Sequence, residues 1–132
     1  MNFNQAIVAG NVTKDPELRT LPSGQTVCEF TVATHRVFTS QGQKQEESEF
    51  HEVVAWGKPA EVVAKYAKKG TLVLVRGRLR TRNWADKTYP EIKHYKTEIV
   101  MDFFELGPKQ SKQADITAMP GPEEGESSQV PL

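Results

Sequence analysis

The sequence is poor in the features that mark several large classes of protein. It has a single cysteine, Cys28, which excludes an internal disulfide and any metal site built from several cysteines. No apolar run approaches the roughly 18 residues that a membrane-spanning helix needs. The first residues lack the basic segment and apolar core of a secretory signal peptide, so we expect a cytosolic protein.

Net charge is also missing, because 17 basic residues balance 17 acidic residues in a chain of 132. The overall charge therefore indicates no class of partner, and only its distribution along the chain is informative. Residues 58–82 hold eight basic residues and one acid, Glu61. So basic a segment in a neutral chain indicates an anionic partner or a strongly solvated strand edge.

Signatures of catalysis are lacking as well. The three histidines, His35, His51 and His94, are scattered and match neither a zinc-protease motif nor a nucleophile elbow. No phosphate-binding glycine loop of the Walker type is present. Glutamates cluster in residues 46–52, where we favour a solvated loop over a metal site. We therefore expect a protein that is not an enzyme and that holds no metal or cofactor.

The chain divides near Gly107 into two parts of different composition. Residues 1–107 carry all the aromatic side chains and the repeated apolar runs. Residues 108–132 are rich in Pro, Gly, Ser, Gln and Glu, a composition that does not offset the entropy of ordering. We predict one folded domain over residues 1–107 and a disordered, mildly acidic tail over residues 108–132.

Apolar, β-prone and alternating segments predict five strands in the domain. Asp15 and Pro16 give the turn signal that ends the first strand. The polar residues 39–47 separate the second strand from the third, and we expect them to form a loop. The five predicted strands cover residues 3–12, 26–38, 48–56, 71–83 and 94–106.

One helix is predicted between the third and fourth strands, over residues 59–69. A proline suits its first position and a glycine its C-terminal stop. Val62, Val63 and Tyr66 would form its apolar face. The resulting order, β-β-β-α-β-β, is that of the OB barrel. We therefore predict an all-β fold with one helix, a five-stranded OB-fold barrel followed by the disordered C-terminal tail.

The strongest local signal is a stripe of arginines in the fourth predicted strand. Arg76, Arg78, Arg80 and Arg82 occupy every second position, and Trp84 continues the alternation. In a strand these side chains share one face at intervals of about 6.6–6.8 Å, near the repeat of an extended nucleic acid backbone. Basic residues also protect exposed strand edges from aggregation, and the stripe alone leaves that interpretation open.

Aromatic residues accompany these cations. Four of them lie at strand ends or among polar residues, namely Phe38, Phe50, Trp56 and Trp84. Flat apolar rings exposed beside cations are what stacking on nucleic acid bases requires. An aromatic residue in a small barrel can equally belong to the core, and for any one of the four the sequence does not decide. The combination of rings with arginines favours a nucleic-acid-binding surface.

The sequence resembles the bacterial-type single-stranded DNA-binding proteins over residues 3–106. Three blocks carry the resemblance: VAGNVTKDPELRTLPSGQTVCEFTVAT at 8–34, EFHEVVAWGKPAEVVAKYAKKG at 49–70 and VRGRLRTRNW at 75–84. The resemblance implies an OB-fold chain that forms homotetramers. It also implies a cytoplasmic, nucleoid-associated protein that wraps single-stranded DNA with little sequence preference during replication, recombination and repair.

The resemblance also implies roles for individual residues. The family's four base-stacking positions match Phe38, Phe50, Trp56 and Trp84. Its phosphate-binding positions match Arg19, Lys58, Lys69, Arg80 and Arg82. From the residues themselves we add Arg36, Arg76 and Arg78 to that group. The first strand, from Phe3 to Val12, resembles the segment through which subunits of the family pair.

The tail departs from the family pattern. Members commonly end in an acidic tip that closes with Ile-Pro-Phe and binds replication and repair proteins. Here the aspartates of that tip are missing and leucine replaces the final aromatic residue. We predict a weak partner-binding tail that consists of Glu123, Glu124, Glu126, Val130, Pro131 and Leu132. A phage, plasmid or divergent bacterial origin would fit this departure.

Other functions are compatible with the same residues. An OB-fold accessory subunit could use the tryptophans and arginines to bind RNA or to serve in a primosome complex. A subunit whose barrel face binds another protein would be indifferent to nucleic acid. A metal-dependent nuclease is the weakest alternative, because no base or nucleophile lies beside the glutamate cluster in the sequence. We predict a non-enzymatic single-stranded DNA-binding protein.

Overall fold

The computed structural model describes residues 1–108, which contain six strands and one helix. The elements are β1 (Ala6–Val12), β2 (Glu17–Thr20), β3 (Thr26–Ser40), β4 (Gln43–Trp56), α1 (Lys58–Tyr66), β5 (Leu72–Ala85) and β6 (Lys93–Leu106). Apart from Pro108, the predicted tail lies outside the described residues. The same holds for its candidate partner-binding residues, Glu123, Glu124, Glu126, Val130, Pro131 and Leu132.

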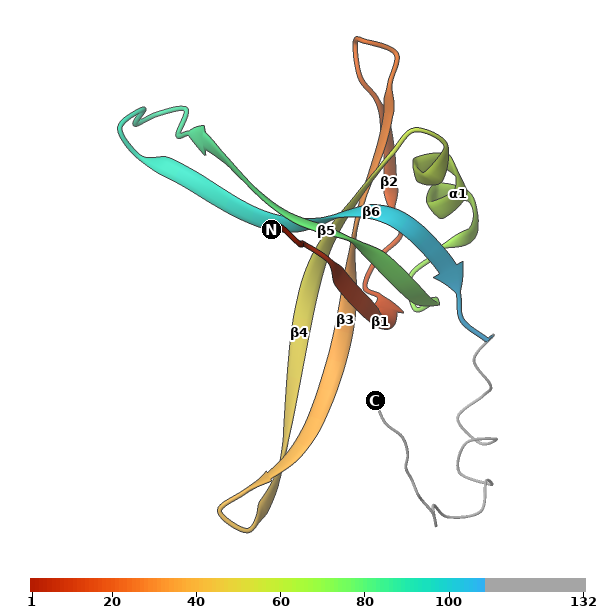
Figure 1. Cartoon of the computed structure of the whole chain (residues 1–132), viewed down its shortest axis with the longest axis vertical. Coiled ribbons are helices and arrows are strands. Elements are labelled where there is room, and N and C mark those ends of the chain that lie inside the picture. The colour runs from red at the N-terminus through yellow and green to blue at the C-terminus, as the bar shows by residue number, and fades with distance from the viewer. Residues whose placement is uncertain (109–132) are drawn as a thin grey trace.

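Five of the strands close into a barrel, as the sequence predicts (Figure 1). β1 pairs with β5, β5 with β6 and β3 with β4, all antiparallel, while β4 and β6 pair in parallel. Asn11 and Val12 of β1 also pair with β3 and complete the ring. With β2 set aside, the order is β-β-β-α-β-β, which is that of the OB fold.

Alternate side chains of the long strands fill the barrel. Cys28, Phe30 and Val32 of β3 are buried, as are Val73 and Val75 of β5. Their spacing by two is that of one face of a strand, so the long strands direct one face into the barrel and the other face outward. The outward faces are therefore the surfaces on which a ligand can bind.

Helix α1 packs on the barrel through small residues. Ala60 and Val63, with Ala67 just after the helix, belong to the buried core. Val62 and Tyr66 are exposed, so their predicted place on the apolar face was wrong. The buried residues follow the i, i+3, i+7 spacing of a single helical face, which Val62 and Tyr66 do not share. The helix ends at Tyr66, earlier than predicted, because the backbone of Ala67 is extended.

The predicted loop over residues 39–47 was also wrong. β3 continues to Ser40 and β4 begins at Gln43, so only a two-residue turn separates them. Gln41 and Gly42 form this turn with positive φ angles of 52° and 76°, as a type I′ turn requires. The sequence hides the hairpin because its residues near the turn are solvated on both faces and show no apolar alternation.

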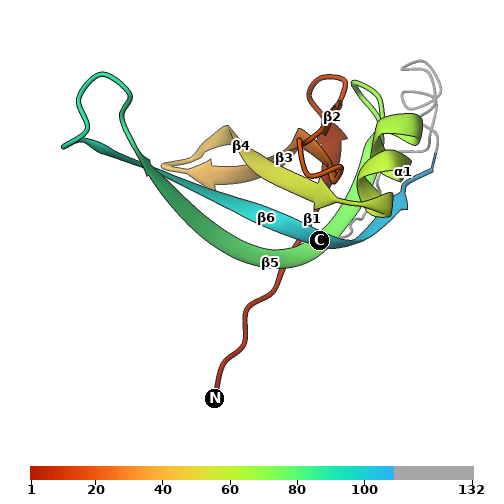
Figure 2. The same cartoon turned by 90° about the horizontal axis from the view of Figure 1, so that it is seen from above.

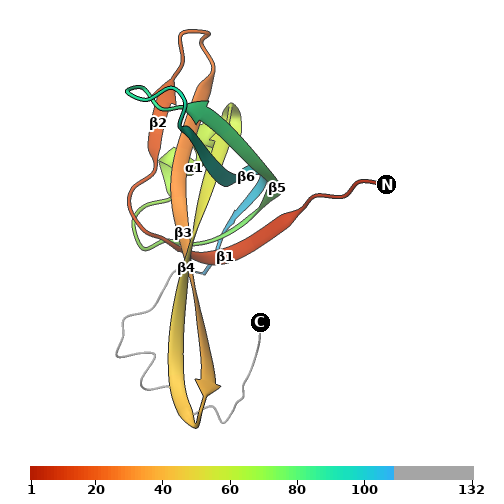
Figure 3. The ribbon, with the colours of Figure 1, turned by 90° about the vertical axis from the view of Figure 1, so that its left-hand side faces the viewer.

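Smaller differences concern the first strands. β1 begins at Ala6 and not at residue 3, and residues 1–5 lead away from the barrel (Figures 2 and 3). β2 was not predicted, because its four residues are all exposed and carry no apolar periodicity. It pairs with the start of β3, outside the closed ring.

The β3–β4 and β5–β6 hairpins extend beyond the barrel in different directions (Figure 1). We call them the β3–β4 arm, residues 34–50, and the β5–β6 arm, residues 78–98. The arms diverge because β4 and β6 pair only where Val53 and Val54 meet Ile99 and Val100. Figure 2 shows the β5–β6 arm at the end of the molecule opposite α1.

Candidate nucleic-acid interface

The alternation predicted for β5 is present in the structure. Val73 and Val75 point into the barrel. The arginines of β5 occupy the even-numbered positions and therefore lie on the outer face of the sheet. Arg78 and Arg82 are exposed there, and Arg80 is half-buried. The stripe is therefore available to a ligand along the β5–β6 arm.

The same outer face continues across the neighbouring strands. Trp56 of β4 and Arg19 of β2 line, together with Arg80 and Arg82, a cavity of about 230 Å³. Its lining brings together residues that are more than 60 positions apart in the sequence. We call this surface the arginine face and define it by Arg19, Trp56, Arg78, Arg80, Arg82 and Trp84.

A buried carboxylate lies at the centre of the arginine face. Glu98 of β6 is the cross-strand partner of Arg80, and its side chain is 2% exposed. Oε2 of Glu98 accepts hydrogen bonds from Nη2 of Arg80 at 2.6 Å and from Nε of Arg82 at 3.3 Å. A carboxylate so deeply buried needs such partners to offset its lost hydration. Each of these bonds uses one nitrogen of a guanidinium, and Nε of Arg80 is buried without a hydrogen-bond partner among residues 1–108.

Two further arginines of the predicted set form exposed ion pairs. Arg19 contacts Glu29 at 3.3 Å, and Nε of Arg76 contacts Asp102 at 3.0 Å. The Arg76 guanidinium carbon also lies 5.0 Å from the centroid of the Phe103 ring. Exposed pairs of this kind contribute about 0–1 kcal/mol each, so an incoming phosphate can displace them at little cost.

The two tryptophans both lie on the outer face of the sheet. Trp56 is half-buried at the end of β4, in the wall of the arginine-lined cavity. Trp84 lies on the β5–β6 arm and is 42% exposed. The guanidinium carbon of Arg82 is 5.0 Å from the centroid of the Trp84 ring. An aromatic surface beside a cation is thus present at both ends of the face.

The two predicted phenylalanines lie on opposite faces of the β3–β4 arm. Phe50 lies on the same face of β4 as Trp56 and is 64% exposed. It lines a second cavity of about 310 Å³ between the arms. Phe38 lies on the same face of β3 as Phe30 and Val32, whose side chains point into the core. The structure therefore places Phe50 on the side of the arginine face and Phe38 on the other side.

The two arms differ in charge. The β5–β6 arm carries six basic and three acidic residues, whereas the β3–β4 arm carries two basic and three acidic residues. Arg36, the predicted cation of the β3–β4 arm, donates from Nε and Nη2 to Glu47 at 3.3 and 3.1 Å and lies 4.3 Å from the centre of the Phe38 ring. Attraction of a polyanion is therefore concentrated on the β5–β6 arm.

The two predicted lysines lie at opposite ends of α1. Lys58 begins the helix two residues after Trp56 and is exposed. Lys69 is exposed beyond the other end, where its backbone N–H donates to Oδ1 of Asp15 at 2.8 Å. Neither lysine lines the arginine-lined cavity. The structure brings Lys58 near the arginine face and leaves Lys69 apart from it.

The sequence analysis assigned no role at this surface to Glu98 or to His94. The available signal for Glu98 was an acid placed directly before the apolar run Ile99–Met101 in a predicted strand. No local pattern marks His94, because its neighbours matter only through the pairing of β5 with β6.

Residues 1–108 show neither a metal site nor a membrane-spanning helix. No group of three or more His, Cys, Asp or Glu side chains in this part of the chain is arranged to bind a metal ion. None of its helices combines the length and the hydrophobicity that crossing a membrane would require.

Comparison with known proteins places the chain in a family. The model of the single-strand binding protein family matches residues 3–106. The chain belongs to this family. A solved structure described as a Plasmodium falciparum SSB complex with ssDNA superposes with a TM-score of 0.72 at 24% identity, over 80% of this chain and 94% of that one. At this identity the likeness supports the OB fold alone.

Curated bacterial relatives of this family member are named single-stranded DNA-binding proteins. Single-stranded DNA-binding protein 1 of Chlorobaculum tepidum is 46% identical over 111 residues, which are 83% of this chain and 68% of that protein. The Staphylococcus aureus protein is 44% identical over 110 residues, 83% of this chain and 69% of its own length. The Enterococcus faecalis protein is 44% identical over 104 residues, 79% of this chain and only 54% of its own length.

Proposed function

We propose that this family member binds single-stranded DNA with little sequence preference and protects it during replication, recombination and repair. The observation that carries the proposal is the arginine face, where Arg78, Arg80 and Arg82 alternate along β5 beside exposed aromatic rings. Membership of the single-strand binding family supports the same function. The proposal involves no catalysis, metal or cofactor.

Binding has two parts in this proposal. Arginines and lysines neutralise phosphates and release counterions, which makes affinity fall as salt rises. The rings of Phe38, Phe50, Trp56 and Trp84 stack on bases, each contributing about 1–3 kcal/mol. The cations contact only the backbone, and every base has a flat face. Low sequence preference follows from both.

The four rings need not act on one straight segment of DNA. Phe50, Trp56 and Trp84 share the outer side of the sheet, whereas Phe38 lies on the other side of the β3–β4 arm. A strand that reaches all four must therefore bend around this arm. Wrapping, rather than a linear groove, is the path that suits these positions.

The experiment that tests the function is a titration of intrinsic tryptophan fluorescence with poly-dT at low and high salt. We expect strong quenching that weakens as salt increases, because both tryptophans belong to the arginine face. Trp56→Ala and Trp84→Ala should each weaken binding to all DNA sequences alike. Absence of quenching together with absence of DNA retention would reject the function. Stronger binding to a matched RNA than to DNA would favour the accessory-subunit alternative.

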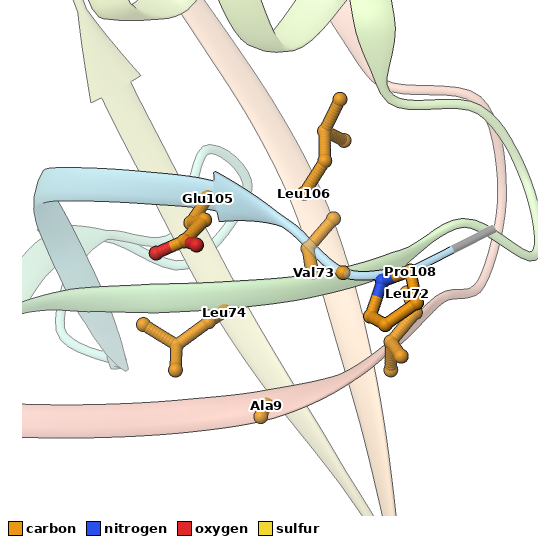
Figure 4. A pocket seen from close by; sticks show the side chains of 8 residues that line it. Ala9, Leu72, Val73, Leu74, Glu105, Leu106 and Pro108 are labelled. Carbon is orange, nitrogen blue, oxygen red and sulfur yellow. The ribbon is translucent and has the colours of Figure 1, made fainter.

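We also propose that the chain forms a homotetramer whose subunits pair through β1. Residues 6–11 pair with β5 along one edge, but only Asn11 and Val12 pair with β3 along the other. Ile7 is exposed on this strand, and an apolar pocket of about 280 Å³ lies between Ala9 and the ends of β5 and β6 (Figure 4). Light scattering of the wild type and of Ile7→Asp tests the assembly, with dissociation expected for the variant.

For the remaining parts of the chain we propose a division of roles. Residues 1–107 suffice for DNA binding, and the tail, residues 108–132, binds replication and repair proteins weakly. A truncation after Gly107 should then keep its DNA affinity and lose any partner. We expect the protein to act in the cytoplasm with the nucleoid, where single-stranded DNA arises, which imaging of a tagged chain would test.

A further inference from the structure

Trp84 contacts two groups that are themselves held by carboxylates. The Arg82 guanidinium carbon is 5.0 Å from the centroid of the Trp84 ring, and Nε of Arg82 is bonded to the buried Glu98. On the paired strand, the His94 ring stacks with Trp84 at a centroid distance of 5.7 Å and an interplanar angle of 28°. Both neighbours of the indole are therefore held in place by carboxylates before any ligand arrives.

Asp86 fixes the imidazole of His94. Nε2 of His94 lies 2.7 Å from Oδ1 of Asp86, while Oδ2 of Asp86 accepts the backbone N–H groups of Thr88 and Tyr89 at 3.0 and 2.9 Å. One carboxylate thus links the imidazole to the turn that closes the β5–β6 arm. Its second oxygen is occupied by backbone groups, so Asp86 cannot swing away without opening the turn.

Stability of the core does not account for this arrangement. Trp84 and His94 lie on the arm beyond the barrel, where they are 42% and, for the His94 side chain, 45% exposed. A ring pair this exposed buries little area compared with the valines of the barrel. What the pair does achieve is to restrict the rotation of a large aromatic side chain that faces solvent.

We propose that His94, anchored by Asp86, is a positioning residue of the interface that holds Trp84 ready for base stacking. This inference rests on the proposed function, since it assigns a role within the same surface. A ring that is already ordered loses less conformational entropy when a base stacks on it, so binding is tighter. The remaining exposed surface of Trp84 is the part on which the base lies.

The test uses a Trp56→Phe background, in which Trp84 is the sole tryptophan of the chain. Acrylamide quenching and anisotropy of Trp84 are measured without DNA, and affinity is measured with a fluorescein-labelled dT oligonucleotide. His94→Ala should make Trp84 more mobile and weaken binding roughly two- to tenfold, the range expected when one aromatic pair is removed. His94→Phe keeps a flat ring but loses the bond to Asp86, so it should lose less affinity than His94→Ala.

Two further variants serve as controls. His94→Gln offers Asp86 a polar partner without a ring and should behave like His94→Ala. His35→Ala removes a histidine from the other arm, where Nδ1 of His35 contacts Ser48 Oγ at 2.7 Å, and should change neither readout. Circular dichroism establishes that each variant is folded at the assay temperature.

Each failure has a distinct signature. Tight binding by the background with unchanged affinity and mobility in His94→Ala would overturn the role of His94. Equal losses in His94→Phe and His94→Ala would overturn positioning by the ring. Failure of the wild type to bind dT would overturn the proposed function, and Trp84 mobility would then still decide whether His94 holds the indole.

Discussion

Arg80 and Glu98 face each other across β5 and β6 with 2.6 Å between Nη2 and Oε2, and the carboxylate is almost fully buried. The surface best suited to attract a polyanion is thus built around a negative charge. Glu98 keeps Arg80 and Arg82 side by side, which two like charges would otherwise resist. The placement of both arginines and the stability of the free protein therefore depend on the same carboxylate.

The first prediction concerns this pair. Glu98→Gln should lower the free energy of unfolding by roughly 1–3 kcal/mol, because hydrogen bonds to charged groups are lost in a buried site. Asp102→Asn is the matched control: it breaks the exposed pair with Arg76 and should cost less than about 1 kcal/mol. Urea unfolding monitored by circular dichroism measures both. Equal effects would contradict the distinction between the buried and the exposed carboxylate.

A second prediction compares two arginines by the salt dependence of DNA binding. Arg78 is exposed on the outer face and forms no ion pair with any other residue of the described chain. Arg78→Ala should therefore reduce the magnitude of the log–log salt slope by about 0.7 for each phosphate that is no longer neutralised. Arg36→Ala should change the slope less, because Arg36 is engaged with Glu47 through two nitrogens. The reverse order would place the phosphate path on the β3–β4 arm.

A third prediction tests the close approach of β5 to β6. A Cβ added at Gly77 would lie 2.0 Å from the carbonyl oxygen of Val100, so the backbones would have to separate. Gly77→Ala should destabilise the protein by about 3 kcal/mol or more, the upper end of the overpacking range, because the clash is with backbone atoms. Gly42→Ala meets no atom within 4 Å and should cost only about 1–2 kcal/mol, from its positive φ. Thermal unfolding of both variants gives the comparison, and a tolerated Gly77→Ala would argue against this register.

The fourth prediction concerns the thiol of Cys28. Burial, helped by the charges of Glu29 and Glu17, raises its pKa to about 11. At pH 8 the thiol is therefore almost entirely protonated and unreactive, since the thiolate is the nucleophile. We expect Ellman's reagent to label native protein very slowly and urea-unfolded protein rapidly. Fast labelling under native conditions would show that β3 opens readily or packs differently.

The fifth prediction concerns acid stability. The hydrogen bond from His94, followed by those from the backbone of Tyr89 and Thr88, lowers the pKa of Asp86. Because the unfolded state then binds the proton more readily, Asp86 stabilises the fold at neutral pH, and this contribution is lost on acidification. The Tm difference between wild type and Asp86→Asn should be largest above about pH 4 and shrink below it. A difference that is constant from pH 2.5 to 7 would disagree with this linkage.

The alternation of residues could be read correctly from the sequence wherever one face of a strand is buried. The apolar Val73 and Val75 show which face of β5 is buried. The outward direction of Arg78, Arg80 and Arg82 follows from that alternation. Residues 39–47 of the β3–β4 arm gave no such signal, because a hairpin solvated on both faces shows no alternation of apolar and polar residues. For this reason the hairpin was mistaken for a loop, while the barrel strands were found.

The sequence by itself determined the five-stranded barrel with its helix, and the spacing of cations and rings along single strands. Those properties are local, since each depends on the period of side chains within one segment. Only the tertiary structure decided that Glu98 lies beneath Arg80, that His94 stacks on Trp84, and that Phe38 and Phe50 lie on opposite faces of the β3–β4 arm. These relationships depend on strand pairing and register, because pairing fixes which residues of different strands become neighbours.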